Sequence, residues 1–434
     1  MIEHEVLYAL LRQEVVPAMG CTEPAAVALA AAYAASVLPG EVQKAKIRVS
    51  PPVLKNGMGV GIPGTGLIGL EIAAAIGIMV ADPQRQLEVL ADINAEKLEK
   101  AKAFLAEERL NLEMQAVEDK VLIEAVLSDG TNTAKAVIRW RHTWLYRLEL
   151  NTEVLKYQVF GEATESKYIS ASAFSLRDYY DFAQSASYEE LLKLDLGEKY
   201  NREIAEYGLR EASGISVGKM LMQQIEEGLL GNDIHHYAMA LTAAATDARM
   251  SGCTLPVISN SGSGNQGLSI TLPIIAVAEK LKLSHDKLLR ALVLGHLVSV
   301  HIKDKVGVLS CLCGCLSAAA GAACGIVLLL GGDFLKVEYA IKNMIGNTTG
   351  MVCDGAKEGC SLKVATNTSA AVQSALLANM GKVISSNDGI ITEDLDETIA
   401  NLARFVISGM ENADSTILSI MINKKNSNKE ENNG

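Results

Sequence analysis

Eight cysteines are the residues of this sequence best suited to chemistry, and five of them fall into two short motifs. CLCGC holds three cysteines and MVCDGAKEGC holds two more. Thiolates bind zinc and iron–sulfur clusters, but structural zinc sites usually combine two C-x₂₋₄-C pairs, which this sequence lacks. The spacing therefore favours a cluster held by scattered cysteines, with buried, unreactive thiols as the alternative. The eight are Cys21, Cys253, Cys311, Cys313, Cys315, Cys324, Cys353 and Cys360.

The second motif can bring its two cysteines to one point. Asp354 and Gly355 form a turn signal directly after Cys353, so that Cys353 and Cys360 flank a single loop. In the first motif, Gly314 allows another backbone segment to come close. The isolated Cys253 and Cys324 have small or apolar neighbours, which is typical of core residues.

Cys21 has a different setting, immediately before a predicted helix. Thr22 suits the N-cap position, and Pro24 suits the first helical turn. The N-terminus of a helix lowers the pKa of a nearby thiol and favours the thiolate. Cys21 is therefore a candidate general base or metal ligand, with an inert thiol as the alternative.

The string NSGSGNQG combines small residues with side-chain amides just ahead of another predicted helix. Its successive N–H groups can converge on an anion such as a carboxylate, and a tight turn between helices is the alternative. HIKDK directly precedes the cysteine-rich segment, so its histidine and first lysine are predicted to line the same cavity. The candidate substrate-binding residues are Asn260, Ser261, Gly262, Ser263, Gly264, Asn265, Gln266, His301 and Lys303.

Two regions of different character have to position these residues. In region 1–165, alternating β-branched segments predict strands at 44–50, 86–92, 112–118, 120–129, 133–142 and 144–151. Helices are expected at 3–17, 24–38, 67–80 and 94–108. Region 1–165 is therefore predicted to be an α+β domain with a mixed sheet, whose N-terminal helices contribute Cys21 to the site.

The remainder of the chain has helical periodicity almost throughout, for example at 272–283 and 369–380. Residues 170–423 are predicted to form a mostly α-helical catalytic domain that binds the cluster. The polar residues 424–434 are predicted to be a disordered tail. The predicted fold class is thus α+β.

Composition narrows the class of protein. The chain has 434 residues, 49% hydrophobic and 5% aromatic, with a formal net charge of −12. This acidic balance argues against nucleic-acid binding, and the N-terminus lacks a signal-peptide pattern, so we expect a cytoplasmic protein. The uncharged stretch 306–332 is interrupted by Ser, Cys and Gly, which predicts a buried helix instead of a membrane span. Abundant Ala and Gly predict helices that pack closely.

Six motifs together resemble those of the L-cysteine desulfidase family. They are MGCTEP (19–24), DARMSG (247–252), SGSGNQG (261–267), HIK (301–303), LCGC (312–315) and GMVCDGAKEGC (350–360). More distantly, the helical region resembles the alpha chain of iron–sulfur L-serine dehydratases. The similarity covers nearly the whole chain, and the pairing of CDGAK with GCTEP is specific.

The resemblance implies an oxygen-sensitive [4Fe–4S] enzyme that works without pyridoxal phosphate. Such an enzyme eliminates sulfide from L-cysteine and gives pyruvate, ammonia and hydrogen sulfide. Three cysteines would hold the cluster and leave one iron open for the substrate. Matched residue by residue, Cys353 and Cys360 are two ligands, and the third lies within CLCGC, where Cys313 is chosen because it begins the matching CGC. Cys21 becomes the candidate base, with a ligand role still open.

Two alternatives stay open at this point. L-serine could lose water on the same scaffold, or the cysteines could sense iron or redox state in a non-catalytic protein. The second alternative leaves the amide-rich string unexplained. We expect a small-molecule substrate, L-cysteine, no nucleic-acid or membrane partner, and a homo-oligomer.

Overall fold

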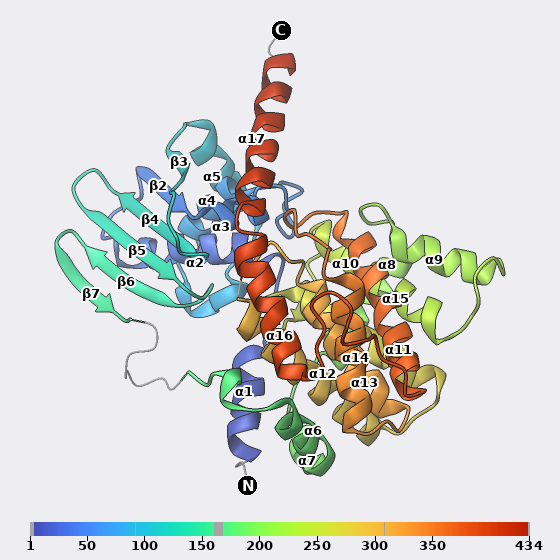
Figure 1. Cartoon of the computed structure of the whole chain (residues 1–434). Coiled ribbons are helices and arrows are strands. Elements are labelled where there is room, and N and C mark those ends of the chain that lie inside the picture. The colour runs from blue at the N-terminus through green and yellow to red at the C-terminus, as the bar shows by residue number, and fades with distance from the viewer. Residues whose placement is uncertain (1–3, 92, 160–167, 308, 433–434) are drawn as a thin grey trace.

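The computed structural model describes residues 4–91, 93–159, 168–307 and 309–432. Figure 1 shows a sheet-containing part on the left and a helical part on the right. The α+β class is therefore confirmed, with the sheet in the N-terminal region. The predicted domain boundary at residue 165 lies outside the described residues.

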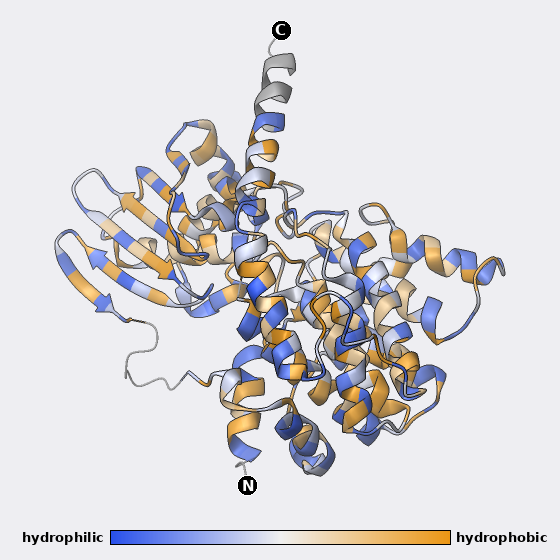
Figure 2. Ribbon diagram, viewed as in Figure 1, coloured by the Kyte–Doolittle hydropathy of each residue, from blue (hydrophilic) through white to orange (hydrophobic). Residues whose placement is uncertain are grey.

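Six strands form the mixed sheet in the order β3-β2-β4-β5-β6-β7. Strands β2 and β3 are parallel, and the other neighbouring pairs are antiparallel. Hydrophobic and hydrophilic residues alternate along β2 and β3 (Figure 2), because successive side chains point to opposite faces of a sheet. The strands are β2 (Lys44–Val49), β3 (Leu110–Met114), β4 (Leu122–Ser128), β5 (Thr133–Arg139), β6 (Leu145–Leu150) and β7 (Glu153–Tyr157).

Helix α2 lies against strands β4 and β5, and α4 packs on α2. The strand predicted at 86–92 is wrong, because the 3₁₀ helix η1 occupies most of this segment. Pro83 begins η1, and the Asp82 side chain caps it by accepting a hydrogen bond from the Gln84 N–H. Helix α3 and strand β7 form where the sequence pattern predicts neither. The helices of this part are α2 (Thr22–Val37), α3 (Pro51–Gly57), α4 (Leu70–Val80), η1 (Pro83–Glu88) and α5 (Ala95–Ala106).

The helical part begins with short elements and continues with long buried helices. Two of them, α11 and α15, begin well before the predicted residues 272 and 369, so polar residues of the motifs form their first turns. The elements are η2 (Ala171–Ala173), α6 (Leu176–Ser185), α7 (Tyr188–Leu191), α8 (Glu198–Arg210), α9 (Val217–Glu226), α10 (Ile234–Met250), α11 (Gly264–Lys280), α12 (His285–Val306), α13 (Cys315–Leu329), α14 (Phe334–Thr348), α15 (Cys360–Asn379), α16 (Leu395–Arg404) and the π-helix η3 (Phe405–Gly409).

Helices approach each other closely where small residues meet. A Cβ added at Gly77 of α4 would lie 2.1 Å from the Ala28 carbonyl oxygen of α2. One added at Gly321 of α13 would lie 2.2 Å from the Gly295 carbonyl oxygen of α12. No side chain fits at such distances, so the predicted close packing is confirmed at these two contacts.

The first and last helices cross between the two parts. Helix α1 (His4–Glu14) buries Leu7 and Leu11 in the core of the helical part. Helix α17 (Ala413–Asn432) follows the helical part in sequence, but it buries Leu418 in the core of the α+β part and packs on α3. Residues 424–432 continue α17 as a helix where the sequence predicts a disordered tail, because extending an existing helix costs much less than starting one.

A small sheet brings two of the motifs together. Strand β1 (Pro17–Ala18) pairs antiparallel with β8 (Val257–Ile258), so that MGCTEP and NSGSGNQG begin side by side. The uncharged stretch folds largely as the buried helix α13, as predicted. Within the described ranges, no helix is long and apolar enough to cross a membrane.

Candidate active site

A cavity of about 110 Å³ lies where the α+β part meets the helical part. Side chains from both parts line it, including the start of α2, α3 and several helices of the helical part. Most of the residues predicted from the sequence meet there. They are Cys21, Ser261, Gly262, Ser263, Asn265, Gln266, Lys303, Cys313, Cys353 and Cys360.

Two chain segments and one helix bring the predicted ligands to this cavity. The Cys313 N–H donates to the Met351 carbonyl at 2.9 Å, and the Cys353 N–H donates to the Cys311 carbonyl at 2.6 Å. These bonds hold the two cysteine motifs side by side in antiparallel pairing. Cys360 is the first residue of α15, so its side chain reaches the cavity from a helix N-terminus.

The N-termini of four helices border the cavity. Cys21 caps α2, Ser263 caps α11, Gly314 caps α13 and Cys360 starts α15. Helix N-termini carry partial positive charge and unpaired N–H groups, which favour anions. Lys303 adds an amine to the lining, and burial lowers the pKa of this amine. The cavity therefore suits an anionic cofactor, an anionic substrate group, or both.

The three cysteines of CLCGC have different surroundings. A hydrogen bond from the Cys315 thiol lowers the pKa of Cys313 to about 7. Burial, by contrast, raises the pKa of Cys353 and raises that of Cys360 to about 11. Cys311 is buried outside the cavity. Cys315 also lines the cavity, but its hydrogen bond to Cys313, followed by burial, raises its pKa. These surroundings favour Cys313 as the third ligand, and the assignment stays a prediction.

Cys21 lies where the sequence predicts, but its ionisation differs. It caps α2 directly, one residue before the predicted cap Thr22. The predicted lowering of its pKa is wrong, because burial, followed by the nearby Glu23 charge, raises the pKa to about 12. The Cys21 thiol donates a hydrogen bond to Glu23 Oε2 at 3.5 Å. A role as base therefore requires that this proton first leaves to an acceptor such as Glu23.

The string NSGSGNQG forms both a tight turn and a helix cap. Asn260 and Ser263 pair through their backbones, and Ser261 and Gly262 between them have positive φ values of 49° and 75°. The Ser261 and Ser263 N–H groups donate to the Glu14 and Asn260 carbonyls. An anion would therefore meet the first turn of α11, which begins at Gly264, instead of the whole string.

Three predicted substrate-binding residues do not line the cavity. His301 and Lys303 are two positions apart on α12, so their side chains point about 200° apart around the helix. Lys303 faces the cavity, whereas His301 packs on the Tyr179 ring with centroids 5.8 Å apart. Asn260 lies beneath the turn and donates to His296 Nδ1 at 3.1 Å, and Gly264 faces the Arg249 guanidinium.

Six polar residues of the lining were not assigned to the site from the sequence: Thr22, Glu23, Asn56, His142, Arg249 and Ser310. Glu23 Oε1 accepts from Asn56 Nδ2 at 2.8 Å and lies 3.9 Å from His142 Nε2. Burial lowers the pKa of His142, which keeps its ring neutral near pH 7. Glu23 lies in the motif MGCTEP and Arg249 in DARMSG, so the sequence offered a signal for both. Asn56 and His142 lie in neither motif, and only the tertiary structure brings them to the cavity.

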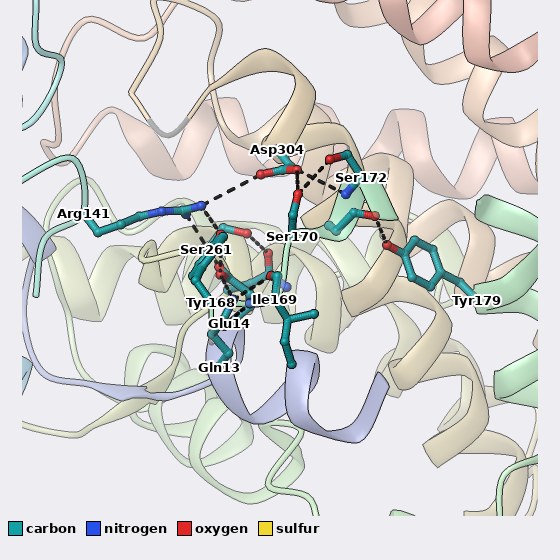
Figure 3. A network of polar contacts seen from close by, with 12 residues as sticks. Gln13, Glu14, Arg141, Tyr168, Ile169, Ser170, Ser172, Tyr179, Ser261 and Asp304 are labelled. Carbon is teal, nitrogen blue, oxygen red and sulfur yellow. Dashed lines mark hydrogen bonds and ion pairs between the residues drawn. The ribbon is translucent and has the colours of Figure 1, made fainter. Parts of the chain in front are cut away.

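Figure 3 shows a polar network that includes Glu14, Arg141, Tyr168 and Asp304. An Arg141 nitrogen lies 3.9 Å from Asp304 Oδ1, and another lies 4.0 Å from Glu14 Oε2. The Tyr168 hydroxyl donates to Glu14 Oε1 at 3.1 Å. Since His142 follows Arg141 and Lys303 precedes Asp304, this network fixes the segments that place both side chains at the cavity.

The thiols at this cavity are donors of the kind that hold iron–sulfur clusters. In the described part of the chain, no three His, Cys, Asp or Glu side chains group closely enough to bind one ion. A cubane cluster has a separate iron for each cysteine, so its ligands stand further apart around one cavity. Cys313, Cys353 and Cys360 line such a cavity, beside helix N-termini that stabilise negative charge.

Comparison with known proteins places these features in a family. The sequence profile named serine dehydratase alpha chain matches residues 84–419. The UPF0597 protein of Oleidesulfovibrio alaskensis is 44% identical over 416 residues, which cover 96% of this chain and 97% of that protein. A UPF0597 protein of Bacteroides fragilis is 42% identical, and the match covers 97% of this chain and 99% of that protein. The UPF0597 protein of Porphyromonas gingivalis is 43% identical, and the match covers 96% of this chain and 98% of that protein. The chain therefore belongs to the iron–sulfur serine dehydratase alpha chain family, whose reaction class is that of a lyase.

Proposed function

We propose that the protein is an L-cysteine desulfidase, which converts L-cysteine to pyruvate, ammonia and hydrogen sulfide by α,β-elimination. One observation carries the proposal. Four thiols, Cys313, Cys315, Cys353 and Cys360, line the same cavity as a fifth thiol at Cys21 and the start of α11. Cluster ligands, a proton-transfer group and an anion-binding helix terminus are the parts that such an elimination needs.

The cluster would be held by Cys313, Cys353 and Cys360, and an iron left open would supply a Lewis acid for the leaving sulfur. The chain's own residues do the remaining work. The first turn of α11 offers N–H groups to the substrate carboxylate, and Arg249 brings positive charge to the same wall. Binding at that wall fixes the orientation of the Cα–H bond relative to Cys21.

Proton removal requires a group that gives up its own proton first. The Cys21 thiol donates to Glu23 Oε2, so transfer along this bond leaves the sulfur able to accept the Cα proton. The Asn56 amide donates to the same carboxylate and holds it in place. As the C–H electrons form the double bond, the C–S bond breaks and sulfide leaves with its electron pair. The aminoacrylate then tautomerises and reacts with water to give pyruvate and ammonia.

Dehydration of L-serine is the second candidate, and the family match favours it. The proton-transfer step is the same, and only the leaving group differs. We propose L-cysteine as the preferred substrate because the resemblance across MGCTEP and CDGAK is to the desulfidases.

A turnover assay with both amino acids tests the proposal. Anaerobically reconstituted protein should form pyruvate and sulfide in equal amounts from L-cysteine, and pyruvate faster from L-cysteine than from L-serine. Cys324→Ala is the matched control, because Cys324 is fully buried in α13 away from the cavity. Pyruvate from L-serine alone would establish the second candidate, and no pyruvate from either would contradict both.

A further inference from the structure

Behind the cavity, one lysine is buried almost completely without lining it. Lys55 of α3 is 2% exposed. Its ammonium donates to the Cys353 carbonyl at 2.8 Å and to Asp414 Oδ1 at 2.6 Å. A buried charge is costly unless it is paired and hydrogen-bonded, so these two acceptors are what hold the lysine there.

The two acceptors come from distant parts of the sequence. The Cys353 carbonyl belongs to the loop that carries two predicted cluster ligands. Asp414 lies in the first turn of α17, where a carboxylate also interacts favourably with the helix dipole. Four residues further on, Leu418 is 3% exposed in the core of the α+β part. Helix α17 is thus anchored at Asp414 and again one turn later at Leu418.

Backbone contacts fit the same loop closely to α3. A Cβ added at Gly355 would lie 2.5 Å from the Lys55 carbonyl oxygen, so the loop rests directly on this helix. The Ala356 N–H donates to the Asn56 carbonyl at 3.3 Å. Asn56 also reaches the cavity, where its side chain donates to Glu23. A displacement of α3 would therefore move both the ligand loop and the carboxylate beside Cys21.

We infer that the Lys55–Asp414 pair positions the Cys353 loop and makes the C-terminal helix α17 part of the cluster site. The inference rests on the proposed cluster, but the restraint on the loop also acts in the cluster-free protein. Neither residue lines the cavity. Lys55 and Asp414 are positioning residues, because they act through the backbone of Cys353.

Three variants separate this role from general stabilisation. Asp414→Asn removes the charge with little change of shape, and Lys55→Met removes the ammonium and keeps the length of the side chain. The double variant Lys55→Met with Asp414→Leu replaces the pair by apolar side chains, which often restores overall stability. It does not restore the hydrogen bond to the Cys353 carbonyl. Asp119→Asn is the control, because it breaks the ion pair with Arg139 (2.8 Å) outside the cavity lining.

Amide hydrogen exchange of the cluster-free protein is the first measurement. We expect the Cys353 and Ala356 amides to exchange about tenfold faster in all three variants, since loss of the pair's hydrogen bonds releases the loop. Asp119→Asn should leave both rates unchanged. Wild-type exchange rates in Lys55→Met and in the double variant would overturn the inference.

The second measurement is the rate at which a chelator removes the cluster under anaerobic conditions. Visible absorbance monitors this loss. The cluster should be lost about tenfold faster from Asp414→Asn and from the double variant than from the wild type. Loss at the wild-type rate from both would overturn the inference even if the proposed function holds. A wild-type protein that takes up no cluster would contradict the proposed function, and hydrogen exchange would still decide whether the pair restrains the loop.

Discussion

Among the thiols at the cavity, Cys21 alone donates to a carboxylate in the described structure. We predict that Cys21→Ala keeps the cluster spectrum and L-cysteine binding. Pyruvate formation should fall by about 10²–10⁴-fold, the usual contribution of a positioned acid–base group. Exchange of the Cα hydrogen with solvent deuterium should fall in parallel, because that step loses its proton acceptor.

Two results would change the role of Cys21. Loss of iron together with activity would make it a ligand. Full iron content with undiminished pyruvate formation would remove it from the mechanism.

The choice among the CLCGC cysteines is the second prediction at this scale. Cys313→Ala should lose the cluster, because Cys313 lines the cavity and has its pKa lowered to about 7 by the Cys315 thiol. Cys311→Ala should keep it, since Cys311 is buried outside the lining. Iron analysis of the two variants checks this. Loss of iron from Cys311→Ala alone would show that Cys313 is the wrong choice.

His296 predicts a dependence of stability on pH. Burial lowers its pKa to about 4, below the value of about 6.5 in an unfolded chain. Its contribution to stability is therefore complete above pH ~6.5 and is lost as the pH falls toward 4. Between pH 7.5 and pH 5 the loss is ~2 kcal/mol. Urea unfolding at both pH values measures this. Between pH 7.5 and pH 5, His296→Gln should lose less free energy of unfolding than the wild type, by about this amount.

The same histidine links pH to the candidate site. His296 Nδ1 accepts from Asn260, which underlies the NSGSGNQG turn. Protonation removes that acceptor, so the turn should loosen before the protein unfolds. Equal losses of stability in the wild type and in His296→Gln would contradict this assignment.

At the residue level, the type and spacing of Cys21, Cys353 and Cys360 single them out, and the structure places all three at the cavity. Their roles stay predictions, and the sequence does not indicate how these thiols ionise. The lowered pKa expected for Cys21 failed because burial and Glu23 outweigh the helix terminus, and burial depends on the folded environment. His142 has no local signal at all, because only the strand pairing brings it to the cavity.

At the scale of elements, the start of α11 depends on one close contact. A Cβ at Gly267 would lie 1.8 Å from the Ile258 carbonyl oxygen of β8. Gly267→Ala should therefore push the helix start away from β8 and cost ~3 kcal/mol or more. The melting temperature of the cluster-free protein measures this.

Gly59→Ala provides the matched control for that change. A Cβ at Gly59 meets nothing within 4 Å, so its effect should stay within ~0.5 kcal/mol. An unchanged melting temperature in Gly267→Ala would contradict the described contact between α11 and β8.

Element boundaries show where sequence periodicity stops being informative. The apolar pattern predicts the middle of α11 and α15 but not their first turns, because Gly264–Gly267 and Cys360 are polar or small. The strand predicted at 86–92 has the right apolar alternation, yet Pro83 and the Asp82 cap favour a 3₁₀ turn. Local chemistry at a chain turn thus outweighs periodicity in a short segment.

At the scale of the molecule, the division into an α+β region and a helical region follows from the change in periodicity. The crossing of α1 and α17 between the two cores does not follow from the sequence. An amphipathic pattern shows which face of a helix is buried, but it does not show which core that face packs against. The cavity depends on that crossing, since α3, which α17 covers, supports the Cys353 loop. The homo-oligomeric state stays a prediction.

The most direct test of the central claim is the iron and acid-labile sulfide content of the wild-type chain after anaerobic reconstitution. We predict about four irons and four sulfides per chain with broad visible absorption, as expected for a cubane cluster. Cys353→Ser and Cys360→Ser should lose most of both. Stoichiometric zinc without broad visible absorption would contradict the account.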